Sequence, residues 1–330
     1  MPLFDNHGRA INYLRLAVTD RCNLRCFYCM PAEGISYVPK EQLLSYEEME
    51  RLVRILAEMG ITKIRITGGE PFVRRNLIDF LWKLHAIPGI EEVHITTNGV
   101  LTTPYVTELK AMGIASVNLS LDTFDRQRFL EITRRDEFDR VLTCFHALLD
   151  HDIPTKINAV VMEGKNTQDL IPLTELTRQY PVSVRFIEEM PFNGEGSHYP
   201  VLVWTHQRIL EVLKAQYPSL EKLPDPLTST SYNYRIPGHQ GTVGIIAAFS
   251  RTFCGTCNRI RLTAQGTLKT CLYDQGVMDI KQIMRAGASD AELRQSFEHT
   301  FRHRAKDGYE AEQQRQTQHP ATESMSTIGG

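Results

Sequence analysis

The 330-residue chain has an ordinary globular composition, with 42% hydrophobic and 23% charged residues, which is enough for one large domain or a main domain with a smaller companion. Its formal net charge of −2 gives no overall field for nucleic acid or an anionic membrane, and no basic stripe interleaved with aromatic residues is visible. Any anionic ligand must therefore be held by local basic residues. Residues 1–9 show no signal-peptide pattern and no stretch approaches a membrane span, so we expect a cytoplasmic protein.

The first two-thirds of the chain alternates between short β-branched runs and longer segments with apolar residues three and four positions apart. The predicted strands cover residues 14–19, 63–67, 93–97, 116–121, 155–161 and 183–188. A helix is expected after Ser45, an N-cap residue with Glu48 three positions on, and Gly60 ends it. Repeated strand–helix units predict an α/β fold with a parallel sheet. Six units are fewer than the eight of a closed barrel, so the sheet is either a partial barrel or open.

The pattern changes near residue 218, which divides the chain into a main region, 1–217, and a smaller C-terminal region, 218–330. Turn-forming residues come first, and two runs beginning near residues 242 and 260 then resemble antiparallel strands. A helical stretch follows from about residue 290. The polar residues from Lys306 onward have little to bury, and composition alone favours a disordered tail.

The seven cysteines form two groups of three and one lone residue, a distribution that indicates metal binding rather than disulfides. The first group is Cys22, Cys26 and Cys29, and the second is Cys254, Cys257 and Cys271. Three thiolates around a 4Fe-4S cluster leave one iron open to a cofactor or substrate. Structural zinc is the alternative, but neither group has an obvious fourth ligand beyond His7 near the first. Cys144 lies in an apolar helical segment and is expected to be a small buried hydrophobe.

Polar and glycine-rich segments follow the predicted strands, where parallel α/β folds carry their sites. These segments are Gly68-Gly69-Glu70-Pro71, Asn98-Gly99, Asp122 and Glu189-Met190-Pro191. In the first of them, two glycines let the backbone approach a ligand closely, and the carboxylate of Glu70 can accept from an ammonium group. We therefore expect one end of the sheet to gather the functional residues.

Three motifs carry a family resemblance. The run CNLRCFYCMP from Cys22 resembles the signature of the radical S-adenosylmethionine (SAM) superfamily, and GGEP from Gly68 resembles its SAM-binding turn. The run FCGTCNRIRLTAQGTLKTCL from Phe253 is similar to the C-terminal cluster motif of the GTP 3',8-cyclases of molybdenum cofactor biosynthesis, and the likeness extends from DNHGR at Asp5 to the final Gly-Gly. This resemblance implies a partial (β/α)6 barrel of TIM type whose mouth is covered by an α+β C-terminal region.

The resemblance also implies two 4Fe-4S clusters, with SAM on the open iron of the first and guanine on that of the second. The implied SAM contacts are Tyr28, Gly69, Glu70, Ser120 and Met190. The implied GTP contacts are Arg15, Lys63, Arg65, Thr96, Lys156, Arg185, Arg259, Ile260 and Arg261. Catalytic roles are implied for Arg259, Arg261, Gly329 and Gly330, the double glycine reaching back into the active site. Single cations usually form surface ion pairs, but Arg15 and Arg65 stand in otherwise apolar strands.

The implied reaction converts GTP to 3',8-cyclo-7,8-dihydro-GTP after a 5'-deoxyadenosyl radical removes the ribose 3' hydrogen. The implied partners are a reductant of flavodoxin or ferredoxin type and a downstream cyclase that forms the pyranopterin, and a homodimer is allowed. Two alternatives stay open. One is a radical SAM maturase, which has no use for the triplet from Arg259 to Arg261, and the other is a zinc-stabilised binding protein in which both cysteine groups are structural.

Overall fold

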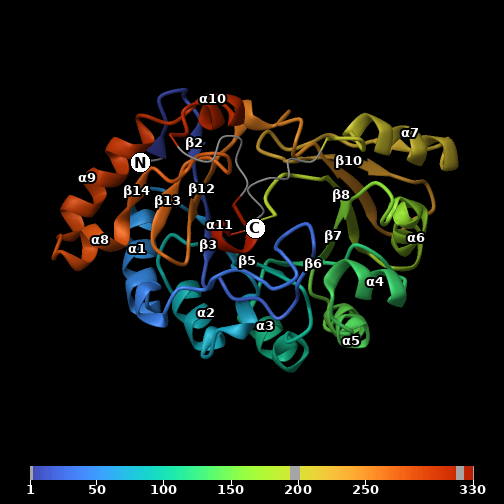
Figure 1. The fold of residues 1–330 in the computed structure, drawn as a ribbon, viewed down its shortest axis with the longest axis horizontal. Coiled ribbons are helices and arrows are strands. Elements are labelled where there is room, and N and C mark those ends of the chain that lie inside the picture. Colours follow the sequence, from blue (N-terminus) through green and yellow to red (C-terminus); the bar gives the residue numbers. More distant parts are fainter. Residues whose placement is uncertain (1–2, 194–200, 317–322, 330) are drawn as a thin grey trace.

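The computed structural model describes residues 3–193, 201–316 and 323–329. Its barrel strands agree with the predicted ranges to within one or two residues (Figure 1). They are β3 (Tyr13–Ala17), β4 (Lys63–Thr67), β5 (Glu92–Thr97), β6 (Ser116–Ser120), β7 (Thr155–Val161) and β8 (Ser183–Glu188). The helices between and around them are α1 (Tyr46–Glu58), α2 (Leu77–His85), α3 (Val106–Met112), α4 (Arg126–Thr133), α5 (Phe138–Asp150) and α6 (Leu170–Gln179).

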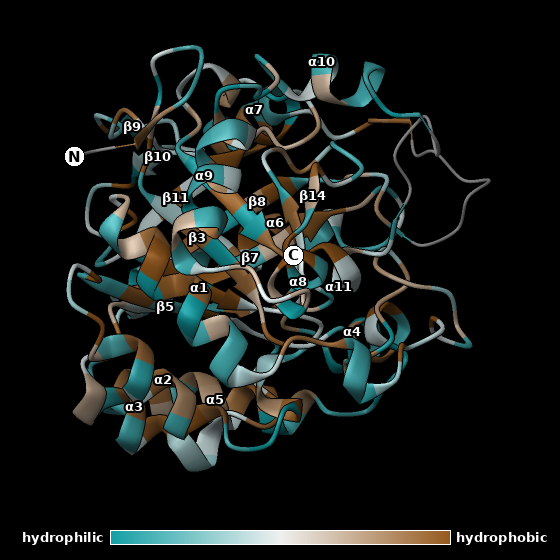
Figure 2. Cartoon of the chain, turned by 90° about the vertical axis from the view of Figure 1, so that its left-hand side faces the viewer, coloured by the Kyte–Doolittle hydropathy of each residue, from teal (hydrophilic) through white to brown (hydrophobic). Residues whose placement is uncertain are grey.

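Local sequence explains why α1 begins where it does. The Ser45 hydroxyl accepts from the backbone N–H of Glu48 at 3.1 Å, and the Glu48 carboxylate accepts from the backbone N–H of Ser45 at 2.7 Å. This capping box satisfies two donors that would otherwise be left free at the helix start. The apolar face of α1, which includes Leu52 and Leu56, is buried against the sheet, and Figure 2 shows hydrophobic strands inside and hydrophilic helix surfaces outside.

Within the described residues the main sheet has twelve strands in the order β14-β13-β12-β3-β4-β5-β6-β7-β8-β11-β10-β9. Pairing is parallel from β12 to β11, and the two outer strands do not meet, so the barrel is partial, as expected. Figure 1 shows helices α1 to α6 around the outside of the curved sheet. The inner face is therefore free to hold a ligand.

The C-terminal region extends this sheet at both ends. Its strands are β9 (Glu221–Lys222), β10 (Ser231–Arg235), β11 (Thr242–Ile246), β12 (Arg259–Leu262), β13 (Thr267–Lys269) and β14 (Met278–Asp279). Two antiparallel pairs occur here, β10 with β11 and β12 with β13. The two runs that the sequence suggested as antiparallel strands contain β11 and β12, which are not neighbours in the sheet: β11 pairs in parallel with β8, and β12 with β3. Pattern reading of single strands missed these two joins because it shows which residues can form a strand but not its neighbour.

The remaining strands and α-helices lie outside the twelve-stranded sheet. They are β1 (Leu3–Phe4), β2 (Ala10–Ile11), α7 (His206–Gln216), α8 (Ile280–Arg285), α9 (Asp290–Phe301), α10 (Gly308–Gln313) and α11 (Met325–Ile328). Cys144 is fully buried in the main core, which confirms its expected role as a small hydrophobe. None of the helices in the described part of the chain has the length and apolar content that a membrane span requires. The division of the chain at residue 217 stays a prediction, since the sheet runs through it.

Candidate active site

The inner face of the sheet encloses a cavity of about 560 Å³. Eighteen of the residues named from the sequence line it: Arg15, Cys22, Cys26, Tyr28, Cys29, Lys63, Arg65, Gly69, Thr96, Ser120, Lys156, Arg185, Met190, Cys254, Cys257, Arg259, Arg261 and Cys271. Three described residues from the same set do not line it, namely Glu70, Ile260 and Gly329. Gly330 lies outside the described residues. Chain segments more than 200 residues apart thus face one space.

The first cysteine group lies on the loop that follows β3. The backbone N–H of Cys29 donates to the carbonyl of Cys26 at 3.0 Å, a turn that brings these two side chains to the same end of the cavity, and the backbone N–H of Leu24 donates to the Cys22 sulfur at 3.4 Å. Burial raises the pKa of Cys22 to about 12 and also raises the pKa of Cys26 and Cys29. Thiols in such a place ionise only when a cation compensates, which fits ligands of an iron-sulfur cluster.

The turn after β4 packs tightly against this cysteine loop. The backbone N–H of Gly69 donates to the Thr19 carbonyl at 2.9 Å, and that of Glu70 donates to the Arg21 carbonyl at 2.8 Å. A Cβ atom at Gly69 would lie 2.3 Å from the Arg21 carbonyl oxygen, closer than real Cβ contacts. Glycine at this position is what allows the turn to approach the residue before Cys22, and it leaves the Gly69 backbone facing the cavity.

The Glu70 carboxylate faces away from the cavity, which differs from its expected contact with an ammonium group. It is fully buried and accepts from the backbone N–H of Asn98 at 2.7 Å, the hydroxyl of Thr97 at 2.8 Å and the backbone N–H of Phe72 at 3.1 Å. Burial raises the pKa of Glu70 to about 7, against the lowering effect of those hydrogen bonds. The side chain therefore ties the turn after β4 to the turn after β5, and only the backbone glycines reach the cavity.

Tyr28 is held by a partner that the motif did not reveal. Its hydroxyl donates to the Asp122 carboxylate at 2.9 Å, and the same carboxylate accepts from the backbone N–H of Val160 at 2.8 Å. Burial raises the pKa of Asp122 to about 6. Asp122 follows β6 and lines the cavity, and its place at a strand end was the sequence signal for it. Ser120 lies two residues earlier on the same side, and Met190 packs beside Phe192 near the tail.

Basic side chains form a ring along the wall of the cavity. The sheet register aligns Arg261 of β12, Arg15 of β3 and Arg65 of β4, and it aligns Arg185 of β8 with Asn158 of β7. One buried guanidinium nitrogen in each of Arg15, Arg65 and Arg185 finds no hydrogen-bond partner among the described residues, although Arg65 Nε donates to the Tyr13 hydroxyl at 2.5 Å. Residues paired in register on neighbouring strands point to the same face of a sheet, and this explains why Arg261, Arg15 and Arg65 project inward together.

The electrostatics of the ring favour the binding of an anion. Burial, followed by the neighbouring Arg65, lowers the pKa of Arg185 to about 10, and burial together with Arg185 lowers that of Lys156 to about 8. Burial and then Arg259 lower the pKa of Arg261 to about 10. Cations that are desolvated beside other cations are costly, and a polyanion bound among them would relieve both effects. Thr96, whose hydroxyl also has no partner in the described part, lies on β5 within this ring.

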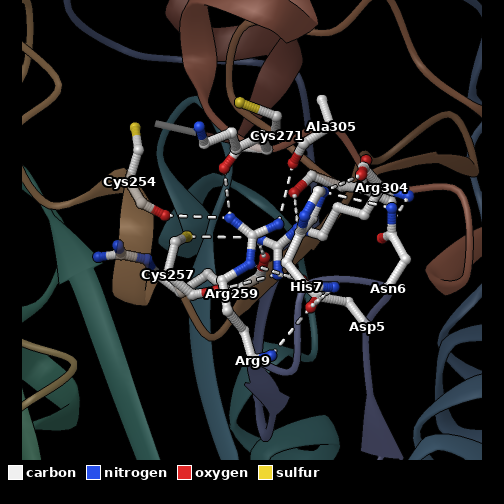
Figure 3. A network of polar contacts seen from close by, with 12 residues as sticks. Asp5, Asn6, His7, Arg9, Cys254, Cys257, Arg259, Cys271, Arg304 and Ala305 are labelled. Carbon is white, nitrogen blue, oxygen red and sulfur yellow. Dashed lines mark hydrogen bonds and ion pairs between the residues drawn. The ribbon is translucent and has the colours of Figure 1, made fainter.

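The second cysteine group faces the cavity beside β12, and Figure 3 shows its surroundings. Burial raises the pKa of Cys271 to about 12. Burial would also raise the pKa of Cys257, but the adjacent guanidinium groups of Arg259 and Arg304 lower it to about 6. Within the described residues, no three His, Cys, Asp or Glu side chains are grouped so as to hold a metal ion.

Composition alone favoured a disordered tail, but residues 325–328 form helix α11. Helix α11 lies at the centre of the barrel in Figure 1, and Met325 and Ser326 line the cavity. The Ser324 hydroxyl donates to the Cys29 carbonyl at 2.8 Å, while the guanidinium of Arg261 donates to the Gly329 carbonyl at 2.8 Å. The segment from 323 to 329 thus spans the space between the two cysteine groups.

Comparison with known proteins agrees with this geometry. The model of the radical SAM superfamily matches residues 16–177, and the model "Molybdenum Cofactor Synthesis C" matches residues 182–310. The GTP 3',8-cyclase of Heliobacterium modesticaldum is 43% identical over 298 residues, which cover 90% of this chain and 91% of that protein. The chain belongs to the GTP 3',8-cyclase family.

Some other relatives of this chain are longer than it is. Molybdenum cofactor biosynthesis protein 1 of Drosophila melanogaster is 43% identical over 86% of this chain but only 50% of its own length, and the Bos taurus protein is 42% identical over 88% and 46%. The chain thus spans about half the length of these curated relatives. Among solved structures, SAM-bound SuiB of Streptococcus suis has a TM-score of 0.58 at 16% identity, covering 80% of this chain and 61% of that one. This likeness concerns the fold alone.

Proposed function

We propose that this protein is a radical SAM GTP 3',8-cyclase that converts GTP to 3',8-cyclo-7,8-dihydro-GTP, an early step in making the molybdenum cofactor. The observation that supports this substrate is one cavity lined by both cysteine groups and by a ring of arginines, in which Arg15, Arg65 and Arg185 each have a buried nitrogen without a hydrogen-bond partner among the described residues. A triphosphate supplies the several negative charges that such a ring requires. The 43% identity to the GTP 3',8-cyclase of Heliobacterium modesticaldum supports the same proposal.

Two 4Fe-4S clusters and SAM form part of this proposal. Cys22, Cys26 and Cys29 would hold the first cluster, and Cys254, Cys257 and Cys271 the second. The raised thiol pKa values of the first group and the three-thiol pattern of both groups support it. When bound, the first cluster and SAM supply a 5'-deoxyadenosyl radical able to remove a hydrogen atom.

The chain's own residues then perform three tasks. The implied SAM-contacting backbone and side chains are Tyr28, Gly69, Ser120 and Met190, with Glu70 acting as a positioning residue that fixes the turn. Arg15, Arg65, Lys156 and Arg185 bind and orient the triphosphate, with Lys63 and Thr96 beside them. Arg259 and Arg261 act near the base, and Arg261 also anchors the tail through Gly329. Oriented substrate and a water-excluding cavity account for the protein's share of catalysis.

The finer features of the function also belong to the proposal. The enzyme would be a carbon–carbon lyase in the cytoplasm, a flavodoxin- or ferredoxin-type protein would reduce it, and a downstream cyclase would make the pyranopterin. A homodimer is compatible with it. The boundary near residue 217 would separate the region that holds the first cluster from the region that brings in the second.

The decisive experiment is anaerobic. The protein is reconstituted with iron and sulfide, then given SAM, dithionite and GTP, and deoxyadenosine and GTP-derived products are followed by mass spectrometry. A cyclised GTP product, together with formation of 5'-deoxyadenosine that GTP stimulates, supports the proposal. SAM cleavage without GTP consumption would leave only the superfamily chemistry and would favour the maturase alternative, whereas a colourless, zinc-loaded protein without sulfide would favour the binding-protein alternative.

Two substitutions separate the roles of the clusters. Cys26→Ala should abolish SAM cleavage, because it removes a ligand of the cluster that binds SAM. Cys257→Ala should leave some uncoupled SAM cleavage but remove GTP binding and cyclisation. Retention of cyclisation in both variants contradicts the two-cluster assignment.

A further inference from the structure

Two buried arginines surround the second cysteine group without lining the cavity (Figure 3). Arg9 lies in the turn between β1 and β2, and Arg304 follows the end of α9. Only 9% of Arg9 and 3% of Arg304 is exposed. Sequence reasoning assigned neither residue a role, and both lie far along the chain from the cysteines that they contact.

Every N–H of the Arg304 guanidinium has an acceptor. One terminal nitrogen donates to the Cys257 sulfur at 3.3 Å and to the Arg259 carbonyl at 2.8 Å. The other donates to the Cys257 carbonyl at 2.9 Å and to the Asp5 carboxylate at 3.4 Å. Nε donates to the carbonyl of Thr270, the residue before Cys271, at 3.0 Å. Five donors in a fixed fork therefore join two of the three cysteine segments.

Arg9 holds the third segment. It donates to the Cys254 carbonyl at 3.1 Å, and also to the carbonyls of Ala305 at 2.9 Å and Lys306 at 2.6 Å, which directly follow Arg304. The same guanidinium therefore ties the Cys254 turn to the segment that carries the other arginine. Together, Arg9 and Arg304 connect all three cysteines of the second group to one network.

Asp5 is the carboxylate that joins the two arginines. Its Oδ2 accepts from Arg9 Nε at 2.6 Å and from Arg304 at 3.4 Å, while its Oδ1 accepts from the backbone N–H groups of His7 and Arg9, each at 2.9 Å. Burial would raise the pKa of Asp5, but these hydrogen bonds hold it below its usual value. His7, once the candidate fourth ligand of the first cysteine group, instead bonds the Arg304 carbonyl through Nε2 at 2.9 Å.

We propose that Arg304, fixed by Asp5 and Arg9, is a positioning residue that sets both the retention and the reduction potential of the second cluster. This inference rests on the proposed function, because that function includes the cluster. A hydrogen bond from a cation to a ligating sulfur stabilises the reduced, more negative cluster more than the oxidised one, so it raises the reduction potential. Bonds to the flanking carbonyls keep the three thiolates at the spacing that the cluster needs.

The test isolates the second cluster in the full-length chain. Replacing Cys22, Cys26 and Cys29 by serine removes the first cluster, and anaerobic reconstitution should then load about four iron atoms per chain. In this background Arg304→Met removes all five donors, Arg304→Lys keeps only the charge, and Arg302→Met is the matched control because Arg302 is exposed two residues earlier. The readouts are the cluster midpoint potential, from redox titration of its paramagnetic signal, and the rate of iron loss to a chelator.

Arg304→Met should lower the midpoint potential and release iron roughly 10- to 100-fold faster, the usual effect of losing an outer-shell partner, with Arg304→Lys in between and Arg302→Met unchanged. A folded Arg304→Met protein with unchanged potential and iron release overturns the proposal. If Arg304→Met does not fold by circular dichroism, Arg304→Lys decides in the same way. If the triple serine chain with Arg304 intact binds no iron or sulfide, the two-cluster function itself is refuted.

Discussion

Adding one methyl group at Gly69 tests the close packing between the turn after β4 and the first cysteine loop. In Gly69→Ala the new Cβ would lie 2.3 Å from the carbonyl oxygen and 2.6 Å from the carbonyl carbon of Arg21. Ordinary contact begins near 3.4 Å, so one of the two segments must move by about 1 Å. The obstacle is backbone, which cannot rotate away as a flexible side chain could.

The expected cost follows from that displacement. Overpacking of this kind costs about 1–3 kcal/mol, and weakening the hydrogen bonds from Gly69 to Thr19 and from Glu70 to Arg21 adds about 1 kcal/mol for each bond. At roughly 2 °C per kcal/mol, this total of about 3–5 kcal/mol should lower the melting temperature of the apoprotein by about 6–10 °C. A shift of this size in the SAM-facing backbone should also slow SAM cleavage about 100-fold.

The assay is thermal unfolding followed by circular dichroism, together with anaerobic measurement of deoxyadenosine. Gly255→Ala is the control for stability, because a Cβ there meets no atom within 4 Å, and its effect should stay within about 0.5 kcal/mol. A Gly69→Ala protein that melts with the wild type and cleaves SAM at the wild-type rate would show that the turn does not depend on this close approach.

Three further predictions concern charge. Arg65→Met should weaken GTP binding by roughly 2–5 kcal/mol but leave the apoprotein at least as stable, because it removes a buried cation that has an unpartnered nitrogen. Titration calorimetry with GTP and thermal unfolding of the apoprotein measure the two effects. Equal losses of binding energy and of apoprotein stability would contradict the prediction. Burial raises the pKa of Asp122 from 3.8 to about 6, so the contribution of this group to stability is greatest below pH 3.8 and is lost as pH rises through about 6. Denaturant titrations of the apoprotein between these pH values should therefore show the wild type losing about 3 kcal/mol relative to Asp122→Asn. Parallel stability curves for the two proteins would refute this prediction. Because the pKa of Lys156 is lowered to about 8, GTP affinity should decline above that pH, and a Lys156→Met protein should lack this decline.

The barrel was predictable because its signals are local. Alternating apolar and polar residues mark β3 through β8, and the same alternation places Arg15 and Arg65 on the inner face. The glycines and cysteines after β3 and β4 also follow from position, since strand ends of a parallel sheet share one edge. The family resemblance added the identity of the ligands, which residue spacing alone left open between iron and zinc.

Long-range partners were not predictable from pattern. Arg9 and Arg304 donate to backbone carbonyl groups, and every residue has such a carbonyl, so the sequence does not mark these partners. A carboxylate such as that of Glu70 can bind either a ligand or the backbone of neighbouring turns, and its sequence position does not distinguish the two. The tail shows the same limit. Its polar composition favoured disorder, yet Ile328 is buried beside Phe192 because the barrel provides a surface for the few apolar residues that the tail has.

The joining of β12 to β3 and of β11 to β8 has a consequence for biosynthesis of the chain. During translation β3 emerges early, but the neighbour that pairs with its outer edge follows more than 240 residues later. Until then both margins of the nascent sheet expose unpaired backbone, a template for association with other chains. Contacts so distant in sequence also slow folding, which prolongs the time for which these margins stay exposed.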